Sequence, residues 1–356
     1  MAQAGGWLPF DAFMHLALYQ AGSGYYATPR PLIGQGPQDG SDFITAPQLS
    51  PLFARSLARA VAAWMAHSGV DEIWEFGAGR GALAAELLAE LDRMGCGPAS
   101  GRVKRYVIVE VSGALRDVQS ARLAAFANVV HWAQAWPEQL HAVVLGNEVL
   151  DAMPVKLLHR VAGAWHERGV IKVGDHFQWQ DRETEWRPPC AIAGAHDYLT
   201  EIAPQAQAWM HTLGAVLRRG VACLIDYGFP EHEYYHPQRA QGTLMCHRAH
   251  LTDADPLSDV GDKDITAHVD FTAMAVAAQD AGLGVVGYTS QGRFLLELGL
   301  VDLLPSVDAA AQAAALKLIH EHEMGELFKV LVVAPEDQAA QLPELGFARG
   351  DRTHTL

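Results

Sequence analysis

Short apolar runs alternate with amphipathic stretches through the middle of this 356-residue chain. The runs have the length and the β-branched content of buried strands, and the stretches between them carry apolar residues at helical spacing. Strands and helices that alternate in this way form parallel sheets covered by helices on both faces. The pattern therefore predicts an α/β fold with a mostly parallel central sheet. The predicted strands are residues 73–76, 106–110, 129–132, 142–148, 221–226 and 328–333.

A different pattern occupies residues 155–196, where polar and apolar residues alternate or pair around Gly163 and Gly174. This alternation predicts antiparallel hairpins inserted into the α/β core. Helical spacing of apolar residues returns afterwards. The predicted helices are residues 198–219, about 271–281 and about 306–324.

The first 66 residues precede the first predicted strand. Apolar spacing predicts a helix over residues 10–18, and the Pro- and Gly-rich composition of residues 29–40 predicts a loop. Ser50 followed by Pro51 is typical of the start of a second helix. We therefore expect a helical N-terminal segment over residues 1–66 and a catalytic core over residues 67–356.

Composition and charge narrow the class of protein. Half of the residues are hydrophobic, yet no apolar stretch is long enough to span a membrane. The N-terminal residues lack the features of a signal or transit peptide, so we expect a cytoplasmic protein without membrane insertion. A formal net charge of −15 disfavours nucleic acid as a partner. The four cysteines lack metal-ligand spacing, and we assign no metal.

A glycine-rich turn follows the first predicted strand. Gly77, Gly79 and Gly81 stand at alternate positions, with Ala78 between the first two, and a helical stretch begins directly after them. Glycine lets a backbone turn sharply and approach a ligand closely, and the first turn of a helix offers unpaired N–H groups. Strand, turn and helix in this order predict a nucleotide-like cofactor at the carboxyl end of the strand.

The glycine spacing alone also fits the dinucleotide pattern, with Ala82 in its last position. Glu75, two residues before Gly77, argues against a dinucleotide because a carboxylate there would repel a pyrophosphate. S-adenosylmethionine has no phosphate, and its ammonium and sulfonium groups suit a nearby negative charge. Glu75 therefore favours S-adenosylmethionine over a nicotinamide cofactor.

The ends of the second and third predicted strands carry further candidates for the cofactor site. Glu110 is placed to accept hydrogen bonds from both ribose hydroxyls of an adenosine, and the alternative is a solvent-exposed strand end. Ser112 is a candidate cap for the next helix. Trp132 is a candidate either for stacking on adenine or for packing in the core.

Polar residues also follow the fourth predicted strand, where α/β folds place their chemistry. Asn147 is a candidate for binding the amino or carboxylate end of S-adenosylmethionine. Glu148 and Asp151 are candidates for holding a cationic acceptor and helping to remove its proton. Helix capping is a serious alternative role for Asp151.

Three later residues have open interpretations. Asp226 ends the fifth predicted strand, where it either lines the acceptor side or starts a turn. His268 is a candidate general base, because the unperturbed pKa of histidine lies near neutrality. Asp270 is either an acceptor-side residue or the N-cap of the following helix.

From residue 10 to residue 333 the chain resembles the MidA family of class I S-adenosylmethionine methyltransferases. Its most specific motifs are Asn-Glu-x-x-Asp-Ala-x-Pro-Val at residues 147–155 and Asp-Ile-Thr-Ala-His-Val-Asp-Phe at residues 264–271. The Glu-Phe-Gly-Ala-Gly-Arg-Gly stretch at residues 75–81 is generic to methyltransferases. Further matching stretches are residues 24–26, 42–47, 110–112, 115–116, 225–228 and 291–295.

The resemblance implies a Rossmann-like methyltransferase core with its N-terminal segment folded over the cofactor. It implies an acceptor-side region at about residues 227–270 and a cofactor site that includes Thr45, Pro47, Val111 and Leu115 beside the residues discussed above. The animal member of the family is a mitochondrial complex I assembly factor that forms symmetric dimethylarginine on a complex I subunit. The resemblance therefore implies a protein substrate, such as a respiratory complex I subunit, methylated on arginine.

Carboxylates suit this chemistry, because bidentate pairing localises the charge of a guanidinium. Glu148 and Asp151 are the first candidates for that pairing, followed by Asp226 and Asp270. Two other functions compete with arginine methylation. One is methylation of another protein residue or of a small molecule by the same core, and the other is a cofactor-binding assembly factor that transfers nothing.

Overall fold

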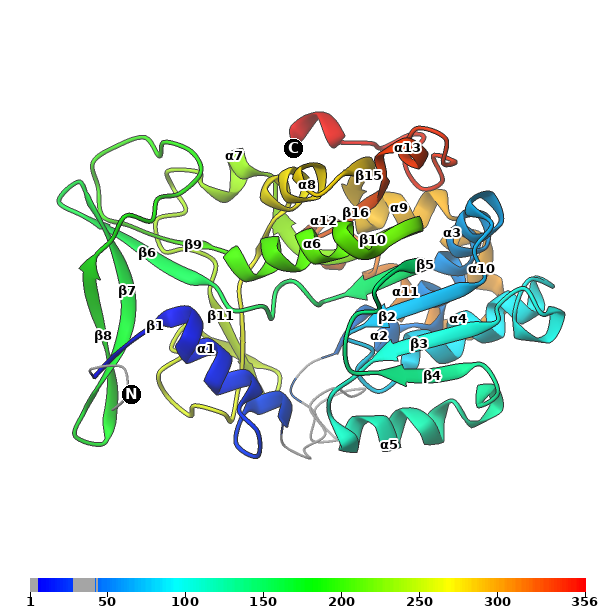
Figure 1. Ribbon diagram of the computed structural model, residues 1–356, viewed down its shortest axis with the longest axis horizontal. Coiled ribbons are helices and arrows are strands. Elements are labelled where there is room, and N and C mark those ends of the chain that lie inside the picture. The colour runs from blue at the N-terminus through cyan, green and yellow to red at the C-terminus, as the bar shows by residue number, and fades with distance from the viewer. Residues whose placement is uncertain (1–5, 28–41, 43) are drawn as a thin grey trace.

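The computed structural model describes residues 6–27, 42 and 44–356, and the chain folds into two adjoining parts (Figure 1). The larger part is built on a sheet with the strand order β15-β16-β10-β5-β2-β3-β4. Its strands are β2 (Glu72–Phe76), β3 (Arg105–Val109), β4 (Val130–Ala133), β5 (Leu140–Asn147), β10 (Leu217–Phe229), β15 (Leu283–Ser290) and β16 (Phe328–Pro335), with the two-residue β14 (Val269–Asp270) beside β10.

Five neighbouring strands of this sheet, from β10 to β4, pair in parallel, while β16 runs antiparallel between β10 and β15. The prediction of a mostly parallel sheet is confirmed. Strand β15 was not predicted, because Gly284 and Gly287 interrupt its apolar run. A Cβ on Gly287 would lie 2.4 Å from the ring of Phe347, so tertiary packing requires a residue that weakens the local strand signal.

Helices cover both faces of the sheet. Helices α3 (Pro51–Ser68) and α4 (Ala82–Arg93) pack on one face with Ile73, and α6 (Pro204–Val216) and α8 (Phe271–Asp280) pack on the other with Trp74. Ile73 and Trp74 are consecutive residues of β2, and consecutive residues of a strand point to opposite faces, so β2 buries apolar side chains on both sides of the sheet. The predicted start of α3 is confirmed, because the Ser50 hydroxyl oxygen accepts a hydrogen bond from the N–H of Leu52 at 3.2 Å.

A second, antiparallel sheet forms the smaller part of the molecule. It joins β1 (Trp7–Pro9), β7 (Ala164–Val173), β6 (Lys156–Val161) and β9 (Tyr198–Ile202), with β8 (His176–Glu183) beside β7. The predicted hairpins are therefore present. Helix α1 (Phe10–Tyr19) packs on this sheet through Phe13, whose ring centroid lies 5.4 Å from that of Phe177.

Two of the predicted helices are wrong in part. Residues 198–202 form strand β9 because they pair with β6, and the helix begins only at Pro204. The helix expected over residues 306–324 shrinks to α11 (Ala309–Lys317), followed by the short α12 (Met324–Leu327). Only Ala315 is buried in α11, so no apolar stripe sustains a longer helix. The loop expected at residues 29–40 lies outside the described residues.

Candidate active site

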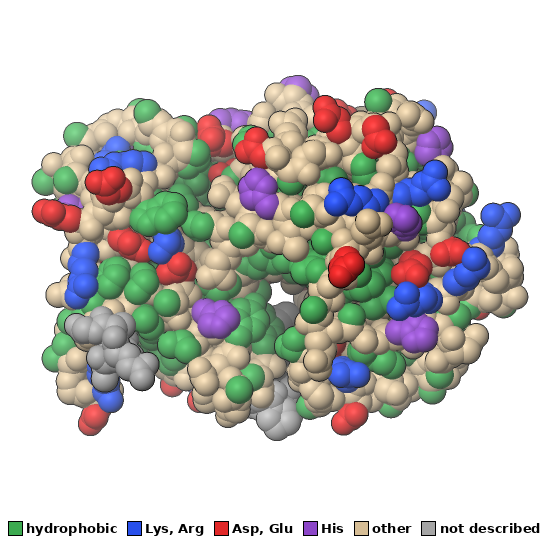
Figure 2. Space-filling view, in the orientation of Figure 1, with side chains coloured by type: hydrophobic (Ala, Val, Ile, Leu, Met, Phe, Trp, Pro, Cys, Tyr) green, Lys and Arg blue, Asp and Glu red, His purple; other side chains and the backbone are tan. Residues whose placement is uncertain are grey.

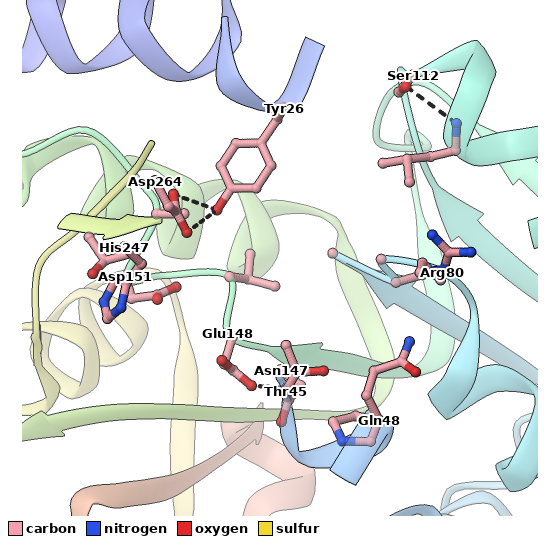
Figure 3. A pocket seen from close by; sticks show the side chains of 18 of the residues that line it. Tyr26, Thr45, Gln48, Arg80, Ser112, Asn147, Glu148, Asp151, His247 and Asp264 are labelled. Atoms are coloured by element: carbon pink, nitrogen blue, oxygen red, sulfur yellow. Dashed lines mark hydrogen bonds between the residues drawn. The ribbon is translucent and has the colours of Figure 1, made fainter. Parts of the chain in front are cut away.

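A cavity of about 1090 Å³ lies at the carboxyl ends of β2, β3 and β5. Figure 2 shows the molecule hollowed between its two parts. The glycine turn and the β5 end form one wall, and Tyr26 of the N-terminal segment lies opposite (Figure 3). Tyr19 of the same segment also lines the cavity. The facing wall also includes residues of β11 (Met245–Arg248) and β13 (Asp264–Thr266).

Most of the predicted site residues line this one cavity. Gly81, Trp132, Asp226 and Asp270 do not line it. The predicted residues on its wall are Thr45, Pro47, Glu75, Gly77, Ala78, Gly79, Glu110, Val111, Ser112, Leu115, Asn147, Glu148, Asp151 and His268.

The glycine turn has the backbone conformation that its sequence predicts. Gly77 and Gly79 have φ values of 67° and 50°, which L-amino acids with a side chain rarely adopt. A Cβ on Gly77 would lie 2.7 Å from Cγ2 of Val149. Gly81 stands behind the turn as the N-cap of α4, so its role is to start the helix rather than to face the cavity.

Glu75 is buried below the turn, and its carboxylate accepts a hydrogen bond of 2.7 Å from the hydroxyl of Tyr106. Burial raises the pKa of Glu75 to about 7, against the opposing effect of this hydrogen bond. At neutral pH the group is therefore divided between its two protonation states. A partly neutral Glu75 repels a pyrophosphate less than a fixed negative charge would, so its burial weakens the preference for S-adenosylmethionine over a dinucleotide.

Glu110 belongs to a hydrogen-bonded group at the end of β3. Its carboxylate accepts from the N–H of Ser112 at 2.8 Å and from Nε2 of Gln119 at 3.2 Å. The same Gln119 nitrogen donates to the carbonyl of Gly79 at 2.8 Å, and the Trp132 indole donates to Oε1 of Gln119 at 2.8 Å. Gln119 thus joins the glycine turn to Glu110. Trp132 supports this group from behind, which favours the packing alternative over adenine stacking.

Ser112 caps a helix, as predicted, and also lines the cavity. Its hydroxyl oxygen caps α5 (Gly113–Arg122) by accepting from the N–H of Leu115 at 3.4 Å. The residue also lines the cavity, next to the side chain of Val111, which is 75% exposed. An apolar side chain that is exposed on a cavity wall offers packing surface to a ligand.

The turn after β5 carries two carboxyl groups to the opposite end of the cavity. Nδ2 of Asn147 donates to Oε1 of Glu148 at 2.9 Å. Burial, followed by the charge of Asp151, raises the pKa of Glu148 to about 8. Oδ1 of Asn147 and Oδ1 of Asp151 are both buried without a hydrogen-bond partner. Such orphaned acceptors are rare in folded proteins and indicate a missing ligand or water.

A third carboxyl group, that of Asp264, faces these two (Figure 3). The Tyr26 hydroxyl lies 2.9 Å from both of its carboxylate oxygens. Asp264, Tyr26 and Tyr19 were not among the predicted site residues. The sequence did point to two of them, because Asp264 opens a specific family motif and Tyr26 stands in the matching stretch at residues 24–26.

His268 lines the cavity and is stacked on Phe229, with ring centroids 5.2 Å apart. Burial lowers its pKa to about 4, and the charge of Arg239 acts in the same direction. The imidazole is therefore neutral at pH 7. Asp270 is the N-cap of α8, accepting from the N–H of Ala273 at 3.0 Å, so the capping alternative holds for this residue.

Replacing Asp264 with asparagine is expected to flatten the pH dependence of stability. Burial and the charge of Asp151 raise the pKa of Asp264 from 3.8 to about 7, so the folded protein binds a proton here that the unfolded chain releases. This stabilisation is complete below about pH 4 and is lost as the pH rises through about 7. It amounts to at most roughly 4 kcal/mol. Calorimetry of the ligand-free proteins should show that the melting temperature falls more from pH 5 to pH 8 in the wild type than in Asp264→Asn.

The matched control for this pH experiment is Asp175→Asn, which removes an exposed carboxylate in the β7–β8 turn. Its melting temperature should follow that of the wild type across the whole pH range. Equal slopes for Asp264→Asn and the wild type would contradict the shifted pKa of Asp264.

Across residues 6–27, 42 and 44–356, no three His, Cys, Asp or Glu side chains are grouped so as to hold a metal ion. Within the same ranges, every helix is too short or too polar to cross a bilayer.

Comparison with protein families places residues 56–289 in the family described as "Putative S-adenosyl-L-methionine-dependent methyltransferase". The chain is also similar to a Burkholderia thailandensis protein whose crystal structure contains S-adenosyl-homocysteine. The two are 46% identical with a TM-score of 0.93, over 100% of this chain and 94% of the other. The predicted Rossmann-like methyltransferase fold is confirmed by this match.

More distant relatives carry functional names. The chain is 26% identical to the Drosophila melanogaster "Protein arginine methyltransferase NDUFAF7 homolog, mitochondrial", over 96% of this chain and 86% of the relative. It is 25% identical to the Mus musculus "Protein arginine methyltransferase NDUFAF7, mitochondrial", over 92% of this chain and 80% of the relative.

Proposed function

Because the chain belongs to a family of S-adenosyl-L-methionine-dependent methyltransferases, we propose that it methylates an arginine side chain of a protein. The observation that carries this acceptor is the carboxyl group of Asp151. It is 5% exposed in the cavity wall, and its Oδ1 atom has no partner. Glu148 and Asp264 line the same end of the cavity.

The opposite end of the cavity fits S-adenosylmethionine, the cofactor of this family. The orphaned Oδ1 of Asn147 matches an ammonium donor, and the Glu110 carboxylate matches a pair of ribose hydroxyls. The exposed side chain of Val111 offers apolar surface for an adenine ring. When bound, S-adenosylmethionine supplies the methyl group on its sulfonium sulfur.

The end of the cavity lined by Glu148, Asp151 and Asp264, here called the acceptor end, is suited to a cation. Burial raises the pKa of Glu148, Asp151 and Asp264, and the charge of Asp151 adds to the rise at the other two. A cationic ligand favours the ionised carboxylates and offsets the cost of burying them. A planar guanidinium has five N–H donors for such a set of oxygens, whereas the ammonium of lysine is a single point of charge.

Glu148 is also suited to receive a proton. A guanidinium nitrogen is a weak nucleophile until its charge is localised and a proton leaves. Burial raises the pKa of Glu148 to about 8 in the unliganded protein, so the carboxylate is a stronger base than a free glutamate once a cationic ligand has favoured its ionised form. Pairing with Asp151 and Asp264 would hold the guanidinium while Glu148 takes the proton.

The names of the distant relatives support both arginine and a protein substrate. A respiratory complex I subunit is the first protein to test, since the family resemblance implies it. At about 25% identity these names remain a reason to test the substrate rather than an assignment of it.

The proposal is tested by transfer of labelled methyl groups into proteins extracted from source cells that lack the gene. We expect label in the protein fraction, and amino-acid analysis of that fraction should recover it as methylarginine. Asp264→Asn should lower the transfer at least tenfold, because one charged partner of the guanidinium is lost.

Three outcomes would contradict arginine as the acceptor. Label in methyllysine would indicate another protein residue, and label only in small molecules would indicate a metabolite acceptor. Saturable binding of S-adenosylhomocysteine without any transfer would favour the assembly-factor alternative.

A further inference from the structure

Asp226 is buried behind the acceptor end, 1% exposed and outside the cavity wall. Its Oδ2 atom nevertheless accepts hydrogen bonds from three consecutive backbone N–H groups of the turn after β5. The donors are Val149 at 3.1 Å, Leu150 at 2.9 Å and Asp151 at 3.3 Å. Successive N–H groups that converge on one anion form an anion-binding nest. Here a carboxyl oxygen of the protein itself occupies the nest.

We propose that Asp226 is a positioning residue, which fixes the turn after β5 so that Glu148 and Asp151 face the cavity. It touches neither end of the cavity and therefore acts through those two side chains. The inference rests on the proposed function, in which Glu148 and Asp151 hold the acceptor. It replaces the earlier expectation that Asp226 itself takes part in the chemistry.

The turn needs such a support because its backbone is strained. Glu148 has a φ of 54°, in the left-handed region that a residue with a side chain avoids. Conformations of this kind persist only where the surrounding structure enforces them. Strand β10 supplies that constraint twice, because the carbonyl of Ile225 accepts from the N–H of Glu148 at 2.9 Å and Asp226 accepts from the next three.

The next residue of β10 acts on the side chain rather than on the backbone. The Tyr227 hydroxyl donates to Oδ2 of Asp151 at 2.5 Å, while the N–H of Tyr227 donates to Oδ1 of Asp226 at 3.0 Å. Asp226 thus fixes the backbone of Asp151, and Tyr227 fixes its carboxylate. Oδ1 of Asp151 is left without a protein partner, as a ligand-binding atom requires.

A purely structural role for Asp226 makes a different prediction. Loss of any buried carboxylate that binds backbone N–H groups would lower the melting temperature. If Asp226 positions the turn, its loss would also loosen residues 149–151 specifically and reduce methyl transfer. The cofactor end of the cavity would still bind S-adenosylhomocysteine. The two roles are therefore separated by measurements on the turn and on the cofactor.

The test compares Asp226→Ala and Asp226→Asn with the wild type by amide hydrogen exchange, by calorimetric titration with S-adenosylhomocysteine, and by labelled methyl transfer. We expect exchange at residues 149–151 to rise at least tenfold in Asp226→Ala and transfer to fall about a hundredfold. Affinity for S-adenosylhomocysteine should change less than tenfold. Asp226→Asn keeps one acceptor oxygen, so its rate of methyl transfer should be about tenfold higher than that of Asp226→Ala. It also provides the test if the alanine variant fails to fold.

Two further variants sharpen the test. Tyr227→Phe should lower transfer with exchange at residues 149–151 unchanged, because it removes the hydroxyl that binds the Asp151 carboxylate and leaves the Asp226 carboxyl group in place. Asp92→Asn is the matched control, since Oδ1 of Asp92 also holds a loop, through the N–H of Ala99 at 2.7 Å, but at the far end of α4. It should leave both transfer and exchange at residues 149–151 as in the wild type.

Unchanged exchange at residues 149–151 in both Asp226 variants would overturn the positioning role. So would normal transfer by a variant in which the turn has loosened. Failure of the proposed function looks different, because the wild type itself would then transfer no label to arginine while the exchange data would still report on the turn.

Discussion

Valine at position 79 is expected to abolish saturable binding of S-adenosylhomocysteine. Gly79 lies on the cavity wall with a φ of 50°, which a β-branched residue adopts only at a considerable energetic cost. The new side chain would also disturb the carbonyl of Gly79, which accepts a hydrogen bond from Gln119 beside Glu110. Calorimetric titration should show at least a hundredfold loss of affinity, and methyl transfer should be lost with it.

The matched control for Gly79→Val is Gly101→Val. Gly101 has a similar φ of 71°, a Cβ added to it meets nothing within 4 Å, and it stands outside the cavity wall. Gly101→Val should therefore introduce comparable backbone strain, lower the melting temperature and keep normal affinity for S-adenosylhomocysteine. Normal affinity in Gly79→Val would refute the assignment of the glycine turn as the cofactor site.

Glutamine in place of Glu148 is expected to reduce methyl transfer at least a hundredfold while changing the affinity for S-adenosylhomocysteine only a few-fold. The amide keeps an oxygen that accepts from Nδ2 of Asn147, so the turn retains its hydrogen bond. It loses the negative charge that pairs with a cationic acceptor and the site that receives its proton. Initial rates of labelled transfer, measured beside calorimetric titrations, separate the two effects.

Glu86→Gln is the control for the Glu148 variant. It makes the same chemical change on α4, where the half-buried Glu86 pairs with Arg55 of α3 at 3.3 Å. Glu86 lies outside the cavity wall, so transfer should remain at the wild-type level. Unchanged turnover in Glu148→Gln would remove Glu148 from the mechanism.

Local sequence was sufficient for the end of the cavity formed by the glycine turn and Glu110. The alternating glycines between a buried strand and a helix specify their own turn, since the positive φ values of Gly77 and Gly79 and the helix that follows depend on neighbouring residues in the chain. Glu110 could be placed for the same reason, because a strand end in a parallel sheet always faces the ligand side. The mostly parallel sheet and the helices on both of its faces also followed from periodicity.

The acceptor end was only partly predictable, because it is assembled from segments far apart in the chain. Asp264 reaches the cavity through pairing of β13 with β11, and Tyr26 comes from the N-terminal segment, 238 residues away in sequence. No local spacing connects these residues. Strand β9 was missed for a similar reason, since its pairing with β6 overrides a helical pattern.

The sequence by itself determined the class of fold, the glycine turn and the identity of the polar residues at the strand ends, because each depends on residues that are close in the chain. Only the tertiary structure decided which carboxylates face the cavity and which are buried behind it. Asp226 ends one apolar run and Asp151 comes shortly after another, so the pattern does not tell which of them faces the cavity. Long-range hydrogen bonds separate them, since three backbone N–H groups bind Asp226 inside the protein and leave Asp151 at the cavity wall.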